Sequence, residues 1–139
     1  MDVAALRRLC LGFPGVFEDF SFGPETSVFK VRAAVSGARH EAKMFALSAM
    51  ADDDFAVSLK CEPALAEQLR AAHPEITGAW HLNKTHWNGV RLDGSLPDSM
   101  VCDMVEDSYD LVVATLSRRQ QEQLGWARLA QDSARTVRP

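Results

Sequence analysis

Two segments of the chain alternate apolar and polar side chains with a period of two, and this pattern limits the possible folds more than any other feature. In the first segment Phe29 and Val31 alternate with Lys30 and Arg32. Residues 55–60 continue the pattern as Phe55, Ala56, Val57, Ser58, Leu59 and Lys60. Because successive side chains of a strand point to opposite faces, each segment would bury one face and expose the other. The alternation therefore predicts antiparallel strands in a sheet with one covered face.

Helical patterns frame these strands. The expected helices begin at or after residues that favour a helix start, namely Asp2, Pro63, Pro97 and Ser117. Further strands are expected over residues 17–22, 41–50 and 87–92. This order of elements predicts an α+β fold, a two-layer sandwich in which helices pack on one face of an antiparallel sheet.

The 139 residues are enough for one domain with a single core. We expect residues 1–125 to form this domain and residues 126–139 to form a flexible tail, because few residues of the tail are apolar. The chain contains no apolar run of about 18 residues, and its N-terminus lacks the features of a signal peptide. The expected protein is therefore cytoplasmic and does not span a membrane.

Acidic and basic residues are unevenly distributed along the chain. Residues 98–116 contain five acidic side chains and no Lys or Arg, whereas residues 117–139 contain five arginines and two acidic residues. The formal net charge of −4 is not typical of strong nucleic-acid binding. Four acidic residues are expected to form one solvated side of the longest helix: Asp103, Glu106, Asp107 and Asp110.

The polar side of the predicted strands is rich in basic residues. Lys30, Arg32 and Lys60 would share the exposed sheet face, and Trp87 and Arg91 share one face of another predicted strand. If that face is also the exposed one, the basic side chains could hold phosphates while the indole stacks on an unpaired base. This composition predicts weak binding of DNA or another nucleic acid; the alternative is a solvated sheet face that binds nothing.

Residues 80–88 hold an unusual group of aromatic, imidazole, carboxamide and basic side chains: Trp80, His81, Asn83, Lys84, His86, Trp87 and Asn88. In the nucleic-acid interpretation Lys84 contacts phosphate, and His86 helps Trp87 to stack or to position the backbone. A second interpretation is a protein-interaction or small-ligand module centred on residues 81–87. In a third, the segment is a structural corner in which Asn83 and His86 satisfy buried backbone groups.

The sequence favours no metal site, cofactor or catalytic activity. His81 and His86 could bind a metal only with a further ligand such as Asp93, which makes a weak pattern. The three cysteines are widely spaced and form no C-x-x-C pair, which argues against a disulfide framework and a zinc site. Known catalytic motifs for nucleophiles, phosphate loops and metalloproteases are also missing from the sequence. We therefore expect a domain that is not an enzyme.

A series of short motifs follows the chain in a characteristic order. They include Phe13-Pro14-Gly15, Glu18-Asp19-Phe20, Phe22-Gly23, Val28-Phe29-Lys30-Val31, Lys43-Met44-Phe45-Ala46-Leu47, His81-Leu82-Asn83-Lys84, His86-Trp87-Asn88, Leu92-Asp93-Gly94 and Ser108-Tyr109-Asp110-Leu111-Val112. Over roughly residues 5 to 124 this ordered set resembles the MmcQ/YjbR family of small bacterial proteins.

The resemblance implies a fold similar to the frataxin/CyaY fold, an antiparallel sheet backed by helices. Members of the family are commonly labelled DNA-binding, by analogy with a double-wing arrangement, and no enzymatic activity is attached to the family. The frataxin likeness also suggests iron or protein binding through an acidic ridge on the first helix. Here that helix carries Arg7 and Arg8, so iron binding is not carried over to these residues.

Overall fold

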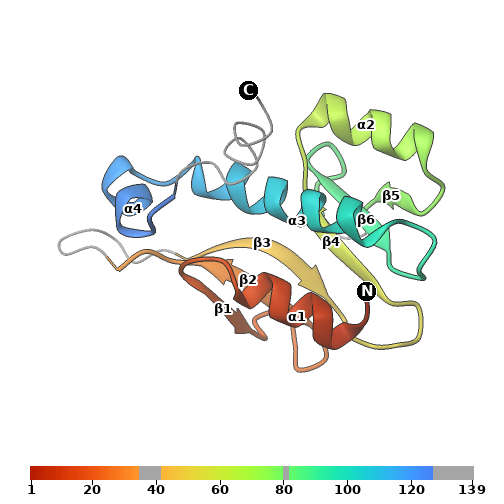
Figure 1. The fold of residues 1–139 in the computed structure, drawn as a ribbon, viewed down its shortest axis with the longest axis horizontal. Coiled ribbons are helices and arrows are strands. Elements are labelled where there is room, and N and C mark those ends of the chain that lie inside the picture. Colours follow the sequence, from red (N-terminus) through yellow and green to blue (C-terminus); the bar gives the residue numbers. More distant parts are fainter. Residues whose placement is uncertain (35–41, 80–81, 127–139) are drawn as a thin grey trace.

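Six antiparallel strands form one sheet in the computed structural model, which describes residues 1–34, 42–79 and 82–126 (Figure 1). The strands are β1 (Val16–Asp19), β2 (Ser27–Val31), β3 (Lys43–Ser48), β4 (Ala56–Lys60), β5 (Ile76–Gly78) and β6 (Trp87–Arg91). Their order across the sheet is β1-β2-β3-β4-β6-β5, so β6 pairs with both β4 and β5. Strands β1 to β4 form the meander that the alternation predicts.

Four helices lie in the described residues: α1 (Val3–Leu11), α2 (Pro63–Ala72), α3 (Asp98–Val113) and α4 (Arg118–Gln123). The Asp2 carboxylate accepts a hydrogen bond from a backbone amide of the first turn at 2.8 Å and caps α1. Ser117 and Gln120 form a capping box at the start of α4. The predicted helix starts are confirmed. A bilayer-spanning segment is not found among these helices, since each is too short or too polar.

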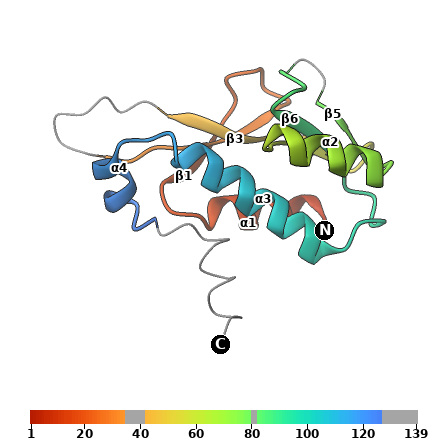
Figure 2. The same cartoon turned by 90° about the horizontal axis from the view of Figure 1, so that it is seen from above.

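Helices α1, α2 and α3 pack on the same face of the sheet, and the core lies between the two layers (Figure 2). At its centre Tyr109 of α3 is fully buried, with its ring stacked on Phe13 at a centroid distance of 4.8 Å. The same ring meets Phe45 of β3 edge-on at 5.5 Å, and its hydroxyl donates to the Pro14 carbonyl oxygen at 2.7 Å. The predicted α+β fold, an antiparallel sheet with helices on one face, is confirmed.

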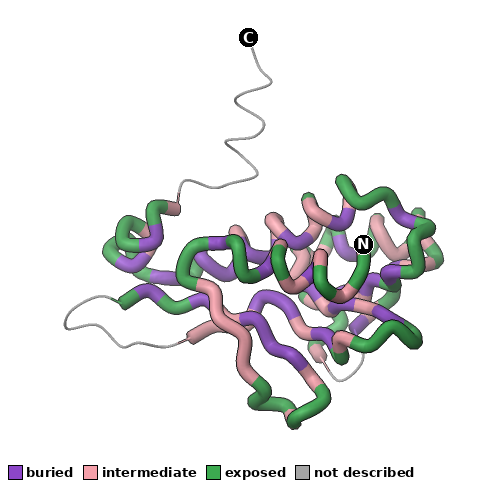
Figure 3. Tube along the Cα trace, turned by 60° about the horizontal axis from the view of Figure 1, so that its bottom comes forward, coloured by how far each residue is buried: buried purple, intermediate pink, exposed green. Residues whose placement is uncertain are grey.

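Burial alternates along β4 and β6, while the loops at the strand ends are exposed (Figure 3). In β4, Val57 and Leu59 are buried, whereas Lys60 and its neighbours on the same side are partly exposed. In β6, Asn88 and Val90 are the buried residues. The sheet therefore has a core face and an opposite face, which carries no helix among the described residues and which we call the open face.

Some elements differ from the sequence-based expectation. Strand β1 ends at Asp19, so Phe20 and Phe22 lie in the following loop, with exposed fractions of 53% and 60%. Strand β5 is not predicted by the alternation, because its three residues are too few to show a period. Trp126, expected in the tail, donates from its indole nitrogen to Asp110 Oδ1 at 2.9 Å. The rest of the expected tail lies outside the described residues.

Candidate functional site

The pairing around Ala46 identifies the two faces of the sheet. Ala46 of β3 pairs with Phe29 on one side and with Leu59 on the other, and all three side chains are buried. Since adjacent residues of a strand point to opposite faces, Lys30 and Lys60 both point to the open face. Only β3 separates their strands, which places the two backbones about 10 Å apart.

Strand register extends these two lysines into a row across the open face. Lys60 pairs directly with Trp87 of β6, and Lys30 pairs with both Phe17 of β1 and Met44 of β3. Directly paired residues point to the same face of a sheet. Five strands therefore contribute to what we call the cross-strand row: Phe17, Lys30, Met44, Lys60 and Trp87. The predicted grouping of both lysines with Trp87 agrees with this geometry.

The basic side chains of the open face differ in their partners. Lys30 Nζ lies 2.9 Å from Asp19 Oδ2, and this hydrogen bond, helped by hydrogen bonds from Ser21, lowers the pKa of the Asp19 carboxyl. The Arg32 guanidinium lies 4.8 Å from the centroid of the Phe17 ring. Lys60 forms no ion pair with the described part of the chain. Lys60 is thus the lysine of the row whose charge is least neutralised.

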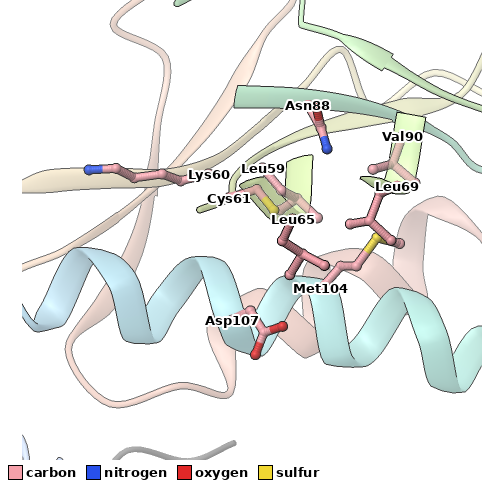
Figure 4. A pocket seen from close by; sticks show the side chains of 9 residues that line it. All are labelled: Leu59, Lys60, Cys61, Leu65, Leu69, Asn88, Val90, Met104 and Asp107. Atoms are coloured by element: carbon pink, nitrogen blue, oxygen red, sulfur yellow. The ribbon is translucent and has the colours of Figure 1, made fainter. Parts of the chain in front are cut away.

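The backbone around Lys60 is held firmly while its side chain extends outward. The Lys60 amide donates to the Ser108 hydroxyl oxygen at 2.9 Å, and the Cys61 amide donates to the His86 carbonyl oxygen at 2.8 Å. Figure 4 shows the Lys60 side chain directed away from the cleft between α2 and α3. The ammonium group is therefore presented from a rigid part of the sheet.

Arg91 shares the open face but not the cross-strand row. It pairs with Ala56 at the other end of β4 and lies four residues from Trp87 along β6, a distance of about 13 Å. Its guanidinium nitrogen is 3.7 Å from Asp93 Oδ2. The expectation that Arg91 surrounds the indole together with the lysines is therefore wrong, because alternation specifies a face and not a position along the strand.

Lys84 lies on the side of the sheet that faces α2. Gly78 of β5 pairs with the buried Asn88, and a Cβ atom at Gly78 would lie 3.0–3.1 Å from the side-chain carbons of Lys84. The carbonyl oxygen of Lys84 accepts a hydrogen bond from Arg70 of α2 at 2.9 Å. The aliphatic stem of Lys84 therefore covers Gly78 and does not join the open face.

The described part of the 80–88 segment is a hydrogen-bonded corner. Asn83 Oδ1 accepts from the Thr85 amide at 2.9 Å, and the Asn83 carbonyl oxygen accepts from the amides of His86 and Trp87. Asn88 is 2% exposed; its Oδ1 accepts from Arg70 at 2.9 Å, which joins β6 to α2. The His86 residue is exposed. Trp80 and His81, both candidates from the sequence, lie outside the described residues.

Two hollows lie beside this corner. The cleft between α2 and α3 is lined mainly by apolar side chains and has a free volume of about 20 Å³, room for about one water molecule (Figure 4). A second hollow of about 160 Å³ is lined by Pro63, Glu67, Arg70, Lys84 and Thr85. Both are smaller than the pockets of about 300–1,000 Å³ that usually hold small ligands.

The acidic side of α3 is less solvated than the sequence suggests. Asp103 is exposed, but Glu106, Asp107 and Asp110 are partly covered, and Asp107 lines the cleft beside α2. Burial, followed by repulsion from neighbouring carboxylates, raises the pKa of both Glu106 and Asp107. Among the described residues, no three His, Cys, Asp or Glu side chains are grouped as a metal site.

Comparison with known proteins identifies the family. The family model YjbR matches residues 11–111. The protein YjbR of Escherichia coli K12 is 35% identical over 89% of this chain and 98% of its own length. The chain belongs to the YjbR family. The protein YbdF of Escherichia coli O157:H7 is 30% identical over 85% of this chain and 89% of its own length. Both relatives are described only as uncharacterised proteins.

Solved structures agree with the YjbR assignment. The Deinococcus radiodurans protein DR2400 is 36% identical and superposes with a TM-score of 0.81, covering 91% of this chain and 90% of its own. A Pseudomonas syringae protein is 29% identical, with a TM-score of 0.53, and covers 69% of this chain and 86% of its own.

The sheet of this YjbR-family protein also separates charge along its strands. The loops between β1 and β2 and between β3 and β4 lie at the same end of the sheet and carry only acidic charges: Glu25, Asp52, Asp53 and Asp54. We call this the acidic end. The opposite strand ends carry Arg32, Lys43, Lys60 and Lys84, and we call them the basic end. Sequence patterns do not reveal this separation, because it follows from which loops the antiparallel order brings together.

Proposed function

We propose that this domain is a cytoplasmic, non-enzymatic module that binds single-stranded nucleic acid weakly through the cross-strand row. The observation that carries the proposal is the direct pairing of Lys60 with Trp87 on the open face. A lysine beside a partly exposed indole suits a nucleotide whose phosphate pairs with the ammonium group while its base stacks on the ring. An unpaired base is needed for stacking, which favours single strands over duplexes.

Two further basic side chains support the same ligand. Lys30 of the row and Arg32, two residues further along the chain, supply positive charge two strands away, although Asp19 neutralises part of it. With few free charges in the row, the expected binding is weak and strongly salt-dependent. The Asn83–Asn88 corner is then structural: it fixes the start of β6, and thereby the position of Trp87, through backbone and amide hydrogen bonds.

Fluorescence anisotropy tests the proposal with a labelled oligothymidine and a labelled duplex, from low to physiological salt. Lys60→Gln should weaken oligothymidine binding and reduce the slope of log affinity against log salt by about 0.7, the value for one phosphate contact on a single strand. Arg91→Gln is the matched control, because it removes one positive charge from the same face outside the row. Equal effects of the two variants, or no binding to either probe at low salt, would overturn the proposal.

A further inference from the structure

The acidic end of the sheet carries a second feature that nucleic-acid binding does not use. Phe20 and Phe22 are the most exposed large apolar side chains among the described residues, at 53% and 60%. Both belong to the β1–β2 loop, which lies beside the β3–β4 loop (Figure 1). Exposed aromatic pairs of this kind mark interaction sites more often than isolated apolar residues do.

A hollow of about 450 Å³ lies between these two loops. Its apolar lining comes from Phe20 and Pro24 on one loop and from Ala49, Met50 and Ala51 on the other. Phe22 follows Phe20 by two residues in the same loop. The volume is within the range of ligand-binding pockets and is large enough to accept an apolar side chain.

The floor of the hollow is well ordered by its contacts. Met50 packs against the core, and its amide donates to the Ser48 hydroxyl oxygen at 3.1 Å. The same hydroxyl donates to the Ala56 carbonyl oxygen at 2.6 Å and so ties the two ends of the β3–β4 loop together. Arg7, which also lines the hollow, is held by Glu18 at 3.2 Å. The β3–β4 loop, which supplies part of the apolar lining, is therefore held in place by hydrogen bonds.

The two loops that border the hollow carry charge of one sign. The two loops contain Glu25, Asp52, Asp53 and Asp54, with no Lys or Arg in residues 20–26 and 49–55. All four acidic residues are exposed. Arg7, the basic residue of the lining, is neutralised by Glu18. An occupant of this site needs an apolar group for the hollow and positive charges for the rim.

We propose that the acidic end binds a short basic peptide segment of a partner protein, with a large apolar side chain inserted between Phe20 and Met50. Lysines or arginines that flank this side chain face Glu25 and the three aspartates of the β3–β4 loop. The site is independent of the cross-strand row, because it lies at the opposite ends of the strands and attracts the opposite charge.

The probe is a short fluorescein-labelled peptide of alternating lysine and leucine. Its fluorescence anisotropy is measured as the full chain is added. Two matched peptides replace lysine by glutamate or leucine by serine. Binding of the lysine–leucine peptide alone is expected. Phe20→Ser should weaken it about tenfold, as removal of an aromatic contact does at an interface centre, and Asp53→Asn should weaken it less and reduce its salt dependence. Leu11→Ser, at an exposed site on α1, serves as the control and should change nothing.

Several outcomes would overturn the proposal. Equal binding of all three peptides, or equal affinity of the wild type and both site variants, would show that the hollow is not the site. If light scattering detects a dimer that dissociates in the Phe20→Ser variant, the surface binds a second copy and not a peptide. Thermal unfolding checks that each variant is folded. If the Phe20 variant does not fold, Asp53→Asn, which alters only an exposed charge, decides between the outcomes.

Discussion

The hydroxyl of Ser108 on α3 donates a hydrogen bond to the carbonyl oxygen of Phe45 on β3 at 2.6 Å. It also accepts one from the Lys60 amide on β4 at 2.9 Å. The residue pairs between β3 and β4 end at Ala46 and Leu59, so the hydroxyl joins the two strands one step beyond their last pair. The position of Lys60 on the open face therefore depends on a helix that lies on the core face.

Ser108→Ala should lower the free energy of unfolding by about 1–3 kcal/mol, because it leaves the Phe45 carbonyl and the Lys60 amide without their partner in a buried site. Urea denaturation measures the change. Ser99→Ala, at an exposed position in the first turn of the same helix, is the control and should change stability by less than about 0.5 kcal/mol. A loss of unfolding free energy no larger than that of the control would mean that β3 and β4 stay paired without the Ser108 hydroxyl.

Alanine substitutions in the Asn83–Asn88 corner should show which side chains stabilise the fold and which are only exposed. Asn88→Ala should cost about 1–3 kcal/mol, since it removes the buried acceptor of the Arg70 hydrogen bond. Asn83→Ala should cost less, because its partner amide at Thr85 is exposed, and His86→Ala should have little effect. Thermal unfolding of the three variants gives the order. A larger loss for His86 than for Asn88 would contradict the structural role assigned to the amides.

Asp19→Asn should strengthen binding of oligothymidine. The substitution removes the carboxylate that lies 2.9 Å from Lys30 and leaves the lysine free to meet a phosphate. On a plot of log affinity against log salt concentration, the slope should steepen by up to about 0.7, the value for one phosphate contact on a single strand. Asp53→Asn, which makes the same change of charge at the acidic end, is the comparison in anisotropy titrations. If both variants gain the same affinity for oligothymidine, the net charge of the protein and not the cross-strand row governs binding.

Asp107→Asn should stabilise the protein at neutral pH. A carboxyl group whose pKa is raised in the folded state binds its proton more readily there, so this group lowers stability as pH rises from 3.8 through its folded pKa. Removing the charge removes the cost of its partial burial, the main cause of the raised pKa, and relieves repulsion from Asp110 and Asp103, which alone is worth about 0.5–1 kcal/mol. The gain, measured by urea denaturation between acidic and neutral pH, should shrink as pH falls toward 3.8.

Asp98→Asn provides the opposite case on the same helix. Asp98 lies in the first turn of α3 and 2.9 Å from the ammonium group of Met1. Its charge is favourable at a helix N-terminus, so this variant should lose stability at neutral pH. If both variants change stability in the same direction, either burial and repulsion do not destabilise the Asp107 carboxylate or the contacts of Asp98 do not stabilise the fold.

Tyr109, the single tyrosine of the chain, should resist ionisation while the protein is folded. Burial, with a smaller contribution from Asp110, raises the pKa of its phenol to about 12. The folded state then holds the phenolic proton more tightly than the unfolded state, so stability is lost as pH rises from 10 to about 12. Absorbance should show phenolate forming together with unfolding. Ionisation near pH 10 in the folded protein would contradict the buried hydrogen bond to Pro14.

The sequence predicts the fold better than it predicts the site. Alternation in β2 and β4 assigns Phe29, Leu59, Lys30 and Lys60 to their faces, because a period of two is a local property of the chain. Helix starts follow equally from local capping chemistry. Strand β5 does not, because Ile76–Gly78 is stabilised by pairing with β6 and not by its own pattern.

The position of a side chain along the sheet requires the register. Arg91 and Lys60 both alternate with buried residues, yet pairing places one beside Ala56 and the other beside Trp87. Lys84 belongs to a loop, where no period applies, and its contact with Gly78 depends on how β5 meets β6. Ser108 is visible in the sequence as a polar residue within an apolar helical stripe. Its two partners are known only once β3 and β4 are placed beneath it.

At the acidic end of the sheet the one arginine of β6, Arg91, lies 3.7 Å from Asp93, so the loops at this end and the lysine-bearing strand ends opposite them give the sheet an electric dipole along its strands. A polyanion that approaches such a body meets repulsion from the overall negative charge and, at short range, a torque that turns the lysine-bearing end forward. The polyanion then meets the lysine-bearing end first, so a small number of lysines is enough to guide association. When a polyanion occupies the basic end, the loop that carries Phe20 and Phe22 therefore faces away from it, toward solvent.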